Sequence, residues 1–506
     1  MDASTEIEAK FDAAPGWKLP KFTGLATRKV ATTELVATYW DTKDRRLDDW
    51  GVTLRRRTAD GRATEWTVKL PLQASDDGTH RRSEVTVDGA PTTPPDELVA
   101  LLTALRRGKK LKPVAELRTS RRRRRVGNDR SSDVVEITDD RVTSTVGGRA
   151  GPAFRQIEVE LLDDDGEDVM ASVVDSLRRV GLEPSADDSK LRRVLGSPTT
   201  TPQAGKKKRK GKKVSVAALA STAVGRSLSE VVQADPWLRL GDDMETVHTC
   251  RKAVRQLRLD LRTLRPVLER RRTHALRDEL KWYGTLLGEV RDLHVLRARL
   301  IELADEAGIP ADDRDAIVEV LDAQLAVERA NLLSALDGDR YLSLIVDLTE
   351  FERHVPLRST VDPSDPAAGV VATAGRASWK KVAKAHRRAV RHPSAEALHT
   401  LRKKVKHARA TAQLATLAVR SNTKAATAAE KFTKAAGTLK EDLGDLHDAD
   451  VLIEWLDARP GRLESEPAYS AGRLRERTVH RRSELKDAWP DAWNKLDRGR
   501  VRRWTR

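Results

Sequence analysis

The stretch T-E-I-E-A-K, from Thr5 to Lys10, decides how the first part of this chain is interpreted. As a β-strand it alternates, so Glu6, Glu8 and Lys10 share one face and the smaller residues share the other. Two acids and a base on one face can be the solvated side of an edge strand or the lining of an enclosed site, and six residues do not decide between these interpretations. The residues that follow favour the enclosed site.

The same alternation of charged and apolar residues returns in strand after strand of the first 195 residues. The charged residues at such positions are Arg55, Arg57, Lys69, Arg82, Glu84, Glu136, Asp140, Glu158 and Glu160. Alternation alone leaves open whether this face points outward or inward. Acids and bases on the same faces suit an enclosed site better than a solvated surface.

In their order along the chain, these residues resemble the motif set of the CYTH domain of the triphosphate tunnel metalloenzymes, over roughly residues 1–195. The matching positions are Glu6-x-Glu8-x-Lys10, Tyr39-x-Asp41, Leu54-Arg55-x-Arg57, Thr67-x-Lys69, Arg82-x-Glu84, Glu158-x-Glu160 and Ser189-Lys190. The ordered set is specific, whereas a lone ExExK is not. The resemblance implies an α+β domain built on a closed antiparallel β-barrel, a tunnel with acids and bases in its lumen. Helical spacing of leucines and valines adds two helices, over 94–107 and 169–180.

A triphosphate carries several negative charges in a row, so its site needs bases for the non-reacting phosphates and a divalent cation for the transferring one. Carboxylates suit a hard ion, Mg²⁺ or Mn²⁺. The resemblance implies catalytic roles for Glu6, Glu8 and Lys10. The implied metal ligands are Glu6, Glu8, Asp140, Glu158 and Glu160, with Glu136 as the alternative to Asp140. The implied substrate-binding residues are Arg55, Arg57, Lys69, Arg82, Arg118, Arg122 and Lys190.

Other functions fit the same scaffold, which also serves adenylate cyclases, thiamine-triphosphatases and RNA triphosphatases. No base-binding pocket is readable in the sequence, so inorganic triphosphate, cleaved to phosphate and pyrophosphate, is the expected substrate. The charged residues could also pair with one another and merely fill the barrel. Buried ion pairs are an inefficient source of stability, which favours a binding site.

The run R-T-S-R-R-R-R-R, Arg118–Arg125, suggests by itself a nucleic-acid patch or a localisation signal. In a barrel it becomes a strand, with Arg118 and Arg122 on one face and the odd-numbered arginines on the other. We expect Arg118 and Arg122 to face the lumen, because the CYTH family places an arginine after the step that Pro113-Val114 matches.

Length, net charge and cysteine content predict the number of domains, the class of partner and the compartment. A chain of 506 residues predicts two or three domains, and a net charge of +17 predicts a polyanionic partner. The single cysteine, Cys250, excludes a disulfide framework and fits a reducing compartment. The sequence has no apolar run of membrane-spanning length and no signal peptide after Met1. A cytoplasmic protein with no membrane partner is therefore expected, and a phosphate polymer as the polyanion would place it at polyphosphate granules.

A change in amino-acid composition marks the expected domain boundary. Residues 197–213 carry prolines, glycines and a lysine run, with Ala204 as their one apolar residue, and such a segment predicts a flexible basic linker. We therefore expect a tunnel domain over 1–196, a linker over 197–216 and a helical domain over 217–506.

The helical region carries a repeated cationic stripe. An apolar seam at three- and four-residue steps includes Val247, Cys250, Val254, Leu257, Leu261, Leu264 and Leu268. Beside it run His248, Arg251, Lys252, Arg255, Arg258 and Arg262, and the pattern returns at His399, Arg402, Lys403, Lys406 and Arg409. L-G-E-V-R-D at 287–292 likewise returns as L-G-D-L-H-D at 443–448. An internal duplication follows, with halves of about 217–365 and 370–506.

These motifs resemble the CHAD domain, an all-α bundle with an internal two-fold repeat that is found beside CYTH domains and is associated with inorganic polyphosphate. The likeness spans roughly 217–506 and implies that the stripes bind polyphosphate. Cationic rows bind any linear polyanion by counterion release, so single-stranded nucleic acid is the competing ligand. It is not favoured, because neither stripe contains an aromatic residue for base stacking. Two hypotheses remain: a triphosphatase with a binding module, and a non-catalytic protein that binds or targets polyphosphate.

Overall fold

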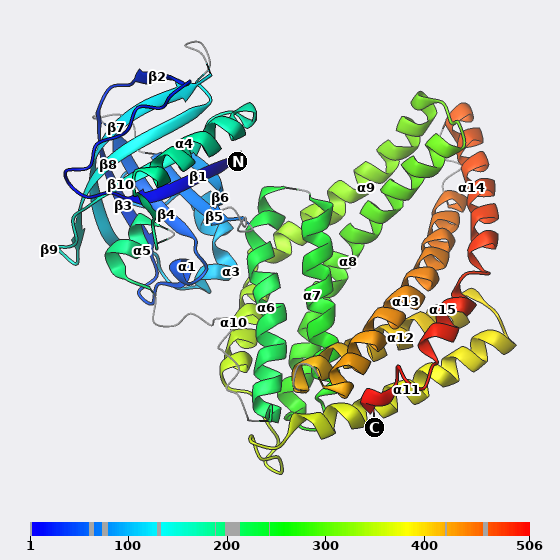
Figure 1. Cartoon of the computed structure of the whole chain (residues 1–506). Coiled ribbons are helices and arrows are strands. Elements are labelled where there is room, and N and C mark those ends of the chain that lie inside the picture. Colours follow the sequence, from blue (N-terminus) through cyan, green and yellow to red (C-terminus); the bar gives the residue numbers. More distant parts are fainter. Residues whose placement is uncertain are drawn as a thin grey trace. The chain divides into compact units, whose positions relative to one another are not determined.

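The computed structural model describes residues 3–59, 65–72, 79–128, 133–187, 189–197, 213–241, 243–419, 423–458 and 464–505. The chain divides into two compact units, Met1–Gln203 and Ala204–Arg506, whose elements are labelled in Figure 1. Most of the expected linker, residues 198–212, lies outside the described residues.

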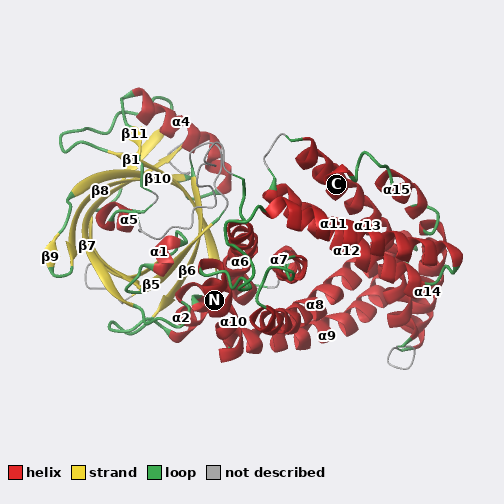
Figure 2. Cartoon of the chain, turned by 90° about the horizontal axis from the view of Figure 1, so that it is seen from below, coloured by secondary structure: helices red, strands yellow, loops and turns green. Residues whose placement is uncertain are grey.

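The first unit is a closed barrel of eight antiparallel strands, which confirms the expected fold (Figure 2). Around the ring the strands are β7 (Lys112–Gly127), β3 (Thr33–Asp41), β4 (Thr53–Ala59), β5 (Glu65–Pro71), β6 (His80–Asp88), β1 (Ala3–Asp12), β10 (Phe154–Leu161) and β8 (Val135–Val146). β8 pairs back with β7 and closes the ring. Three short strands extend it: β2 (Ala26–Lys29) on β7, β9 (Arg149–Ala150) on β8 and β11 (Glu183–Pro184) on β1.

Helices cover part of the outside of the barrel, and this turns the charged strand faces inward. The apolar face of β1, β8 and β10 packs under α4 (Glu167–Arg179), where Phe11 and Ile157 meet Val173 and Leu177. The helix expected over 94–107 is broken at Leu102 into α2 (Asp96–Leu101) and α3 (Thr103–Arg106). Because the apolar residues lie outside under helices, the alternate charged residues are enclosed.

A short helix, α5 (Lys190–Leu195), closes one end of the barrel and lies inside the ring of strands in Figure 2. Ser189 begins it by accepting a hydrogen bond from the amide of Arg192 at 3.1 Å. Leu191 is buried in an apolar cluster with the inward-facing residues Tyr39, Ala115, Leu117 and Val142. Arg45, just before α1 (Arg46–Asp49), fastens the far end of α5 by donating to the Leu195 carbonyl at 3.0 Å.

The second unit is all helical, in two successive runs. The first run is α6 (Val216–Leu240), α7 (Met244–Thr263), α8 (Arg270–Glu306), α9 (Ala311–Asp337) and α10 (Asp339–Arg353). The second is α11 (Ala367–Arg391), α12 (Ala395–Ala418), α13 (Lys424–Asp457), α14 (Ser465–Leu485) and α15 (Trp489–Leu496). Among the described residues, the 3₁₀ turn η3 (Arg503–Thr505) follows α15, and η1 (Asp164–Gly166) precedes α4 in the first unit. The predicted seam is confirmed, since every residue from Val247 to Leu268 assigned to it is buried. Within the described residues, no helix is long and apolar enough to cross a membrane.

Candidate functional site

The barrel encloses a cavity of about 240 Å³ whose lining is almost entirely charged or polar. The lining residues are Glu6, Glu8, Lys10, Tyr39, Thr53, Arg55, Arg57, Lys69, Arg82, Glu84, Arg121, Arg123, Glu136, Glu158, Glu160, Ser189 and Lys190. Most of the positions expected from the sequence are thus brought together. Strand register explains this: Glu8 lies opposite Glu160, and Lys10 opposite Glu158, so both pairs share the inward face.

Carboxylates crowd the part of the cavity between β1 and β10. Lys69 donates to both oxygens of Glu6, at 2.8 and 2.6 Å, and Lys10 lies 2.6 Å from Glu8. Glu160 forms no ion pair with any described residue. Burial, and then the negative charges of Glu6, Glu158 and Glu8, raise its pKa to about 7. Because neighbouring carboxylates contribute to this shift, a cation bound between them would lower the pKa of Glu160 again.

The donors suit a hard divalent ion, because they are carboxylate oxygens. Glu6, Glu8 and Glu160 are the residues that would hold it. In the described part of the chain, no three His, Cys, Asp or Glu side chains already converge as metal ligands. The reason lies in the ion pairs: Lys69 holds Glu6, and Lys190 holds Glu158 at 2.9 Å. A metal ion that binds Glu6 would therefore displace Lys69 from its carboxylate.

Cations gather on the other side of the cavity around Asp140. Arg121 donates to Asp140 at 2.8 and 2.7 Å, and Lys190 does so at 2.6 Å. Burial by itself would raise the pKa of Glu158, but Lys190, Lys10 and Arg121 together hold it well below its usual range. Asp140, an expected metal ligand, is fully buried and absent from the cavity lining. In this structure it positions two cations.

The expected register of β7 was wrong by one residue. Arg118 and Arg122 do not face the lumen; Arg118 has a side chain that is 66% exposed and pairs with Glu116 at 2.9 Å. Arg121 and Arg123 line the cavity instead. Ala115 and Leu117 pack against α5 inside the barrel, so the odd-numbered positions of this strand are the inward ones. The sequence carried no signal for this register, because on β1 and β10 the apolar face is the outward one.

In the helical unit, the two stripes meet at one cluster, which we call the helix cation cluster: Arg251, Arg255, Arg402, Lys406, Arg409 and Lys440. Burial and the charges of Arg251, Arg402 and Arg409 lower the pKa of Arg255 to about 10. Burial and the charges of Arg402, Arg255, Arg251 and Lys440 lower the pKa of Lys406 to about 7. Lys440, from α13, was missed because the sequence repeat does not mark it. A small cavity of about 60 Å³ opens here, lined in part by Lys252, Arg255, Lys406, Arg409 and Lys440.

The duplicated motif has a packing role at this cluster. A Cβ atom at Gly288 would lie 3.4 Å from a guanidinium nitrogen of Arg251, and one at Gly444 equally close to Arg402. The next motif acid pairs with the same arginine: Asp292 with Arg251 at 2.7 Å, and Asp448 with Arg402 at 3.9 Å. Each glycine thus makes room for an arginine that its own motif then orients.

Of the other stripe residues, Lys252, His248 and His399 adjoin this cluster, whereas Arg258 and Arg262 lie apart from it. Arg258 and Arg262 are electrostatic neighbours of Arg277, and Arg262 is also a neighbour of His407. The His399 ring lies against the His447 ring, with centroids 4.5 Å apart and an angle of 46° between the planes. Burial, with His447 and then Lys403 nearby, lowers the pKa of His399 to about 4, so it is neutral at pH 7. His248 is half-buried beside Arg291, and burial lowers its pKa.

Comparison with known proteins agrees with this two-part organisation. Residues 4–194 match the CYTH domain family and residues 222–496 match the CHAD domain family. An uncharacterised protein of Mycobacterium tuberculosis is 28% identical over 97% of this chain and 96% of its own length. Among solved structures, the CHAD domain of the plant Ricinus communis is 22% identical, with a TM-score of 0.46, over 56% of this chain and 92% of its own. PptA from Streptomyces chartreusis is 16% identical, with a TM-score of 0.46, over 55% and 99%.

Proposed function

This chain belongs to the family in which a CYTH domain is followed by a CHAD domain, and from that premise we propose that it is an inorganic triphosphatase with a polyphosphate-binding module. CYTH-family enzymes are metal-dependent triphosphate tunnel enzymes. Beyond this family property, we propose inorganic triphosphate as the substrate, Mg²⁺ or Mn²⁺ as the metal ion, and polyphosphate as the ligand of the helical unit.

The observation that carries the enzymatic part is a single barrel cavity lined by both carboxylates and cations. Glu6, Glu8, Glu158 and Glu160 come from β1 and β10, and the cations come from β1, β4, β5, β6, β7 and α5. A row of phosphates fits such a lining, because the cations can hold the non-reacting phosphates while the carboxylates hold a metal ion at the reacting one.

The residues of the chain then have separate roles. Arg55, Arg57 and Arg82, which line the cavity, would bind phosphate oxygens, together with Arg121 and Lys190, which hydrogen-bond to Asp140. A divalent ion on Glu6, Glu8 and Glu160 would neutralise charge on the transferring group and orient the attacking water. The enclosed lining strengthens each of these interactions by keeping bulk water out.

The cavity also argues for an inorganic substrate. Tyr39 is the one aromatic side chain among the described lining residues, and it is buried beside the cluster that α5 closes. A nucleoside or thiazole ring would need an apolar or aromatic surface, which this lining does not offer. Tripolyphosphate carries no ring, so charged side chains are enough to bind it.

A phosphate-release assay tests this proposal with tripolyphosphate, ATP and thiamine triphosphate, with Mg²⁺ and with EDTA. We expect tripolyphosphate to be the best substrate and EDTA to stop turnover. Glu6→Gln should lower kcat by about 100-fold or more, since one charged group at the reacting centre is lost. Glu116→Gln, on the outward face of β7, is the matched control. Activity that survives in EDTA or in Glu6→Gln would rule the proposal out.

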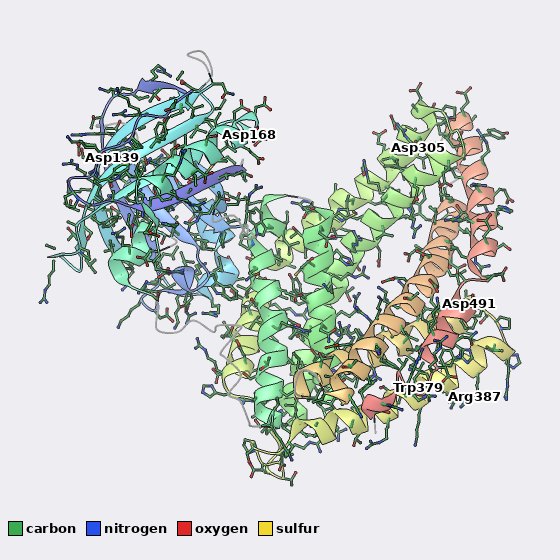
Figure 3. The ribbon with its side chains drawn as sticks, in the orientation of Figure 1. Asp139, Asp168, Asp305, Trp379, Arg387 and Asp491 are labelled. Atoms are coloured by element: carbon green, nitrogen blue, oxygen red, sulfur yellow. The ribbon has the colours of Figure 1, made fainter. Side chains whose placement is uncertain are left out.

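The polyphosphate-binding part rests on an excess of positive charge in the helix cation cluster, where Arg255, Lys406 and Arg409 form no ion pair with a described residue. Buried cations whose pKa values are lowered by one another gain free energy when an anion arrives. Replacing Arg251, Arg255, Arg402 and Lys406 by Gln should weaken polyphosphate binding about tenfold or more and flatten its salt dependence. The control replaces four exposed cations of α11: Lys380, Lys384, Arg387 (labelled in Figure 3) and Arg388. Equal losses in both variants, or equal competition by a single-stranded oligonucleotide, would contradict this assignment.

A further inference from the structure

An open groove of about 860 Å³ lies between α8, α9 and the start of α14, and we call it the acidic groove. Its apolar lining residues include Leu293, Val320 and Val327, of which Val327 is 59% exposed. The acids that line it are Glu289, Glu319, Glu328 and Glu464. Among its described lining residues there is no lysine or arginine, although the chain as a whole has a net charge of +17. The groove therefore differs in sign from the rest of the molecule.

None of these four carboxylates forms an ion pair with a residue that the structure describes. Glu289 and Glu328 instead meet each other. Burial, and then the charge of Glu328 and a hydrogen bond to it, raise the pKa of Glu289. Arg297 of α8, about one turn beyond Leu293, is already bound to Asp322 of α9 at 2.7 Å. A cation that arrives from outside would relieve the repulsion between the two glutamates.

A surface of opposite charge lies on α11. Its buried residues, among them Val371, Val382 and Ala389, share one side of the helix. At about 100° per residue, four exposed cations fall on the opposite side. We call them the α11 cation stripe: Lys380, Lys384, Arg387 (labelled in Figure 3) and Arg391. The helix contains no acid, and within the described part of the chain none of the four has an ion pair or a side-chain hydrogen bond.

We propose that the acidic groove binds α11 of a second copy of this chain, with the α11 cation stripe against the groove acids. The lengths agree, since Lys380 to Arg391 spans about 16 Å of helix and Glu319 to Glu328 spans about 14 Å of α9. In Figure 1 and Figure 2, α11 packs on α12 and lies apart from α8 and α9 of its own chain. The occupant of the groove is therefore an α11 from another copy.

The chemistry of this contact predicts its strength and its form. One helix in one groove is a small interface beside the roughly 1,200–2,000 Å² of stable complexes, so the association should be weak. Salt should weaken it further, because exposed charges are screened beyond about 10 Å at 0.1 M. The two surfaces differ, so each copy keeps one of each free and further copies can add. Polyphosphate affinities measured with dilute protein therefore report on the single chain.

Sedimentation velocity of the full chain, free of polyphosphate, tests the proposal over a range of protein concentrations at low and high salt. The groove variant carries Glu289→Lys and Glu319→Lys, both at exposed positions. The stripe variant carries Lys384→Glu and Arg387→Glu. The matched control carries Asp347→Lys on α10 and Glu430→Lys on α13, two exposed acids outside the groove lining whose replacement changes the net charge as in the groove variant.

At low salt, we expect the unaltered protein to sediment faster as its concentration rises, and at high salt to sediment as a single chain. The groove variant and the stripe variant should each raise the apparent dissociation constant about tenfold or more, because like charges then face each other. The control should behave like the unaltered protein. A one-to-one mixture of the groove and stripe variants should associate again, since the reversed stripe then meets the reversed groove.

Three outcomes would overturn the proposal. The first is an unaltered protein that stays a single chain at every concentration at low salt. The second is an equal loss in the control, or a mixture of the two variants that does not associate, since either result would assign the association to net charge or to other surfaces. The third is association that needs added polyphosphate, which would make the polymer the link between copies. No substrate or metal is present, so the result is independent of the proposed triphosphatase activity.

Discussion

Lys406 is a single residue at which polyphosphate binding should be linked to a proton. Burial, with Arg402, Arg255 and Arg251 nearby, lowers its pKa to about 7, so above pH 7 the free protein carries a neutral amine there. A bound polyanion favours the charged form and raises the pKa again. Affinity should therefore be insensitive to pH below 7 and should fall above it, by up to about tenfold per pH unit.

Calorimetry at pH 8, in buffers with different ionisation enthalpies, measures this linkage. We expect the protein to take up about one proton when it binds polyphosphate, and Lys406→Gln to abolish the uptake. Lys384→Gln, an exposed lysine of α11, should leave it intact. Uptake that persists in Lys406→Gln would assign the proton to another group of the cluster.

At the scale of the element, α8 and α13 each use a glycine to admit an arginine from α7 or α12. Gly288→Ala should displace the Arg251 guanidinium, because the new methyl group lies 3.4 Å from it, and should weaken polyphosphate binding about two- to fivefold. The helix itself should gain up to about 1 kcal/mol from the better helix former. Binding and thermal stability would then change in opposite directions.

Gly472 of α14 provides the control for this prediction. A Cβ atom there meets nothing within 4 Å, so Gly472→Ala should raise the melting temperature and leave polyphosphate affinity unchanged. A Gly288→Ala protein that is more stable and binds normally would show that the position of Arg251 does not matter for binding.

The strands show which features of the barrel could be predicted from the sequence and which could not. Alternation placed Glu6, Glu8 and Lys10 on one face, and the family resemblance gave the closed barrel, both of which the structure confirms. In the run from Arg121 to Arg125 every residue is alike, so periodicity gave two faces without saying which one is inward. That choice depends on the packing of Leu117 against α5, a contact between distant parts of the chain.

Helical patterns had a similar limit. The buried seam of α7 followed from residue spacing, because burial on one helix is a local property. The membership of the helix cation cluster did not, since it depends on how helices cross. Lys440 joins it from α13, whereas Arg258 and Arg262 of the predicted stripe adjoin Arg277.

At the scale of the whole molecule, the two units should act together only on long substrates. Removing residues 217–506 should leave tripolyphosphate turnover nearly unchanged, because such a short substrate cannot reach a second site. KM for longer chains should rise with little change in kcat, since tethering to the helical unit raises their effective concentration at the barrel.

Steady-state kinetics over a ladder of chain lengths, on the full and shortened proteins, measures this. The ratio of the two KM values should be near one for tripolyphosphate and should grow with chain length. A ratio that stays flat along the ladder would exclude tethering, and long chains that bind without being cut would make the helical unit an anchor to polyphosphate.

The closure of the barrel by α5 has a consequence for the order of events in a turnover. A substrate that enters a blind channel end first leaves its leading phosphate deepest, toward α5, where Lys190 and Tyr39 line the cavity. Whichever anhydride bond is cut, the fragment nearer the mouth must depart before the deeper one can follow. The deeper fragment then holds the same space that the next molecule needs, so it competes directly with fresh substrate. A long polymer can be shortened only from an end, and it must back out, at least in part, after every cut.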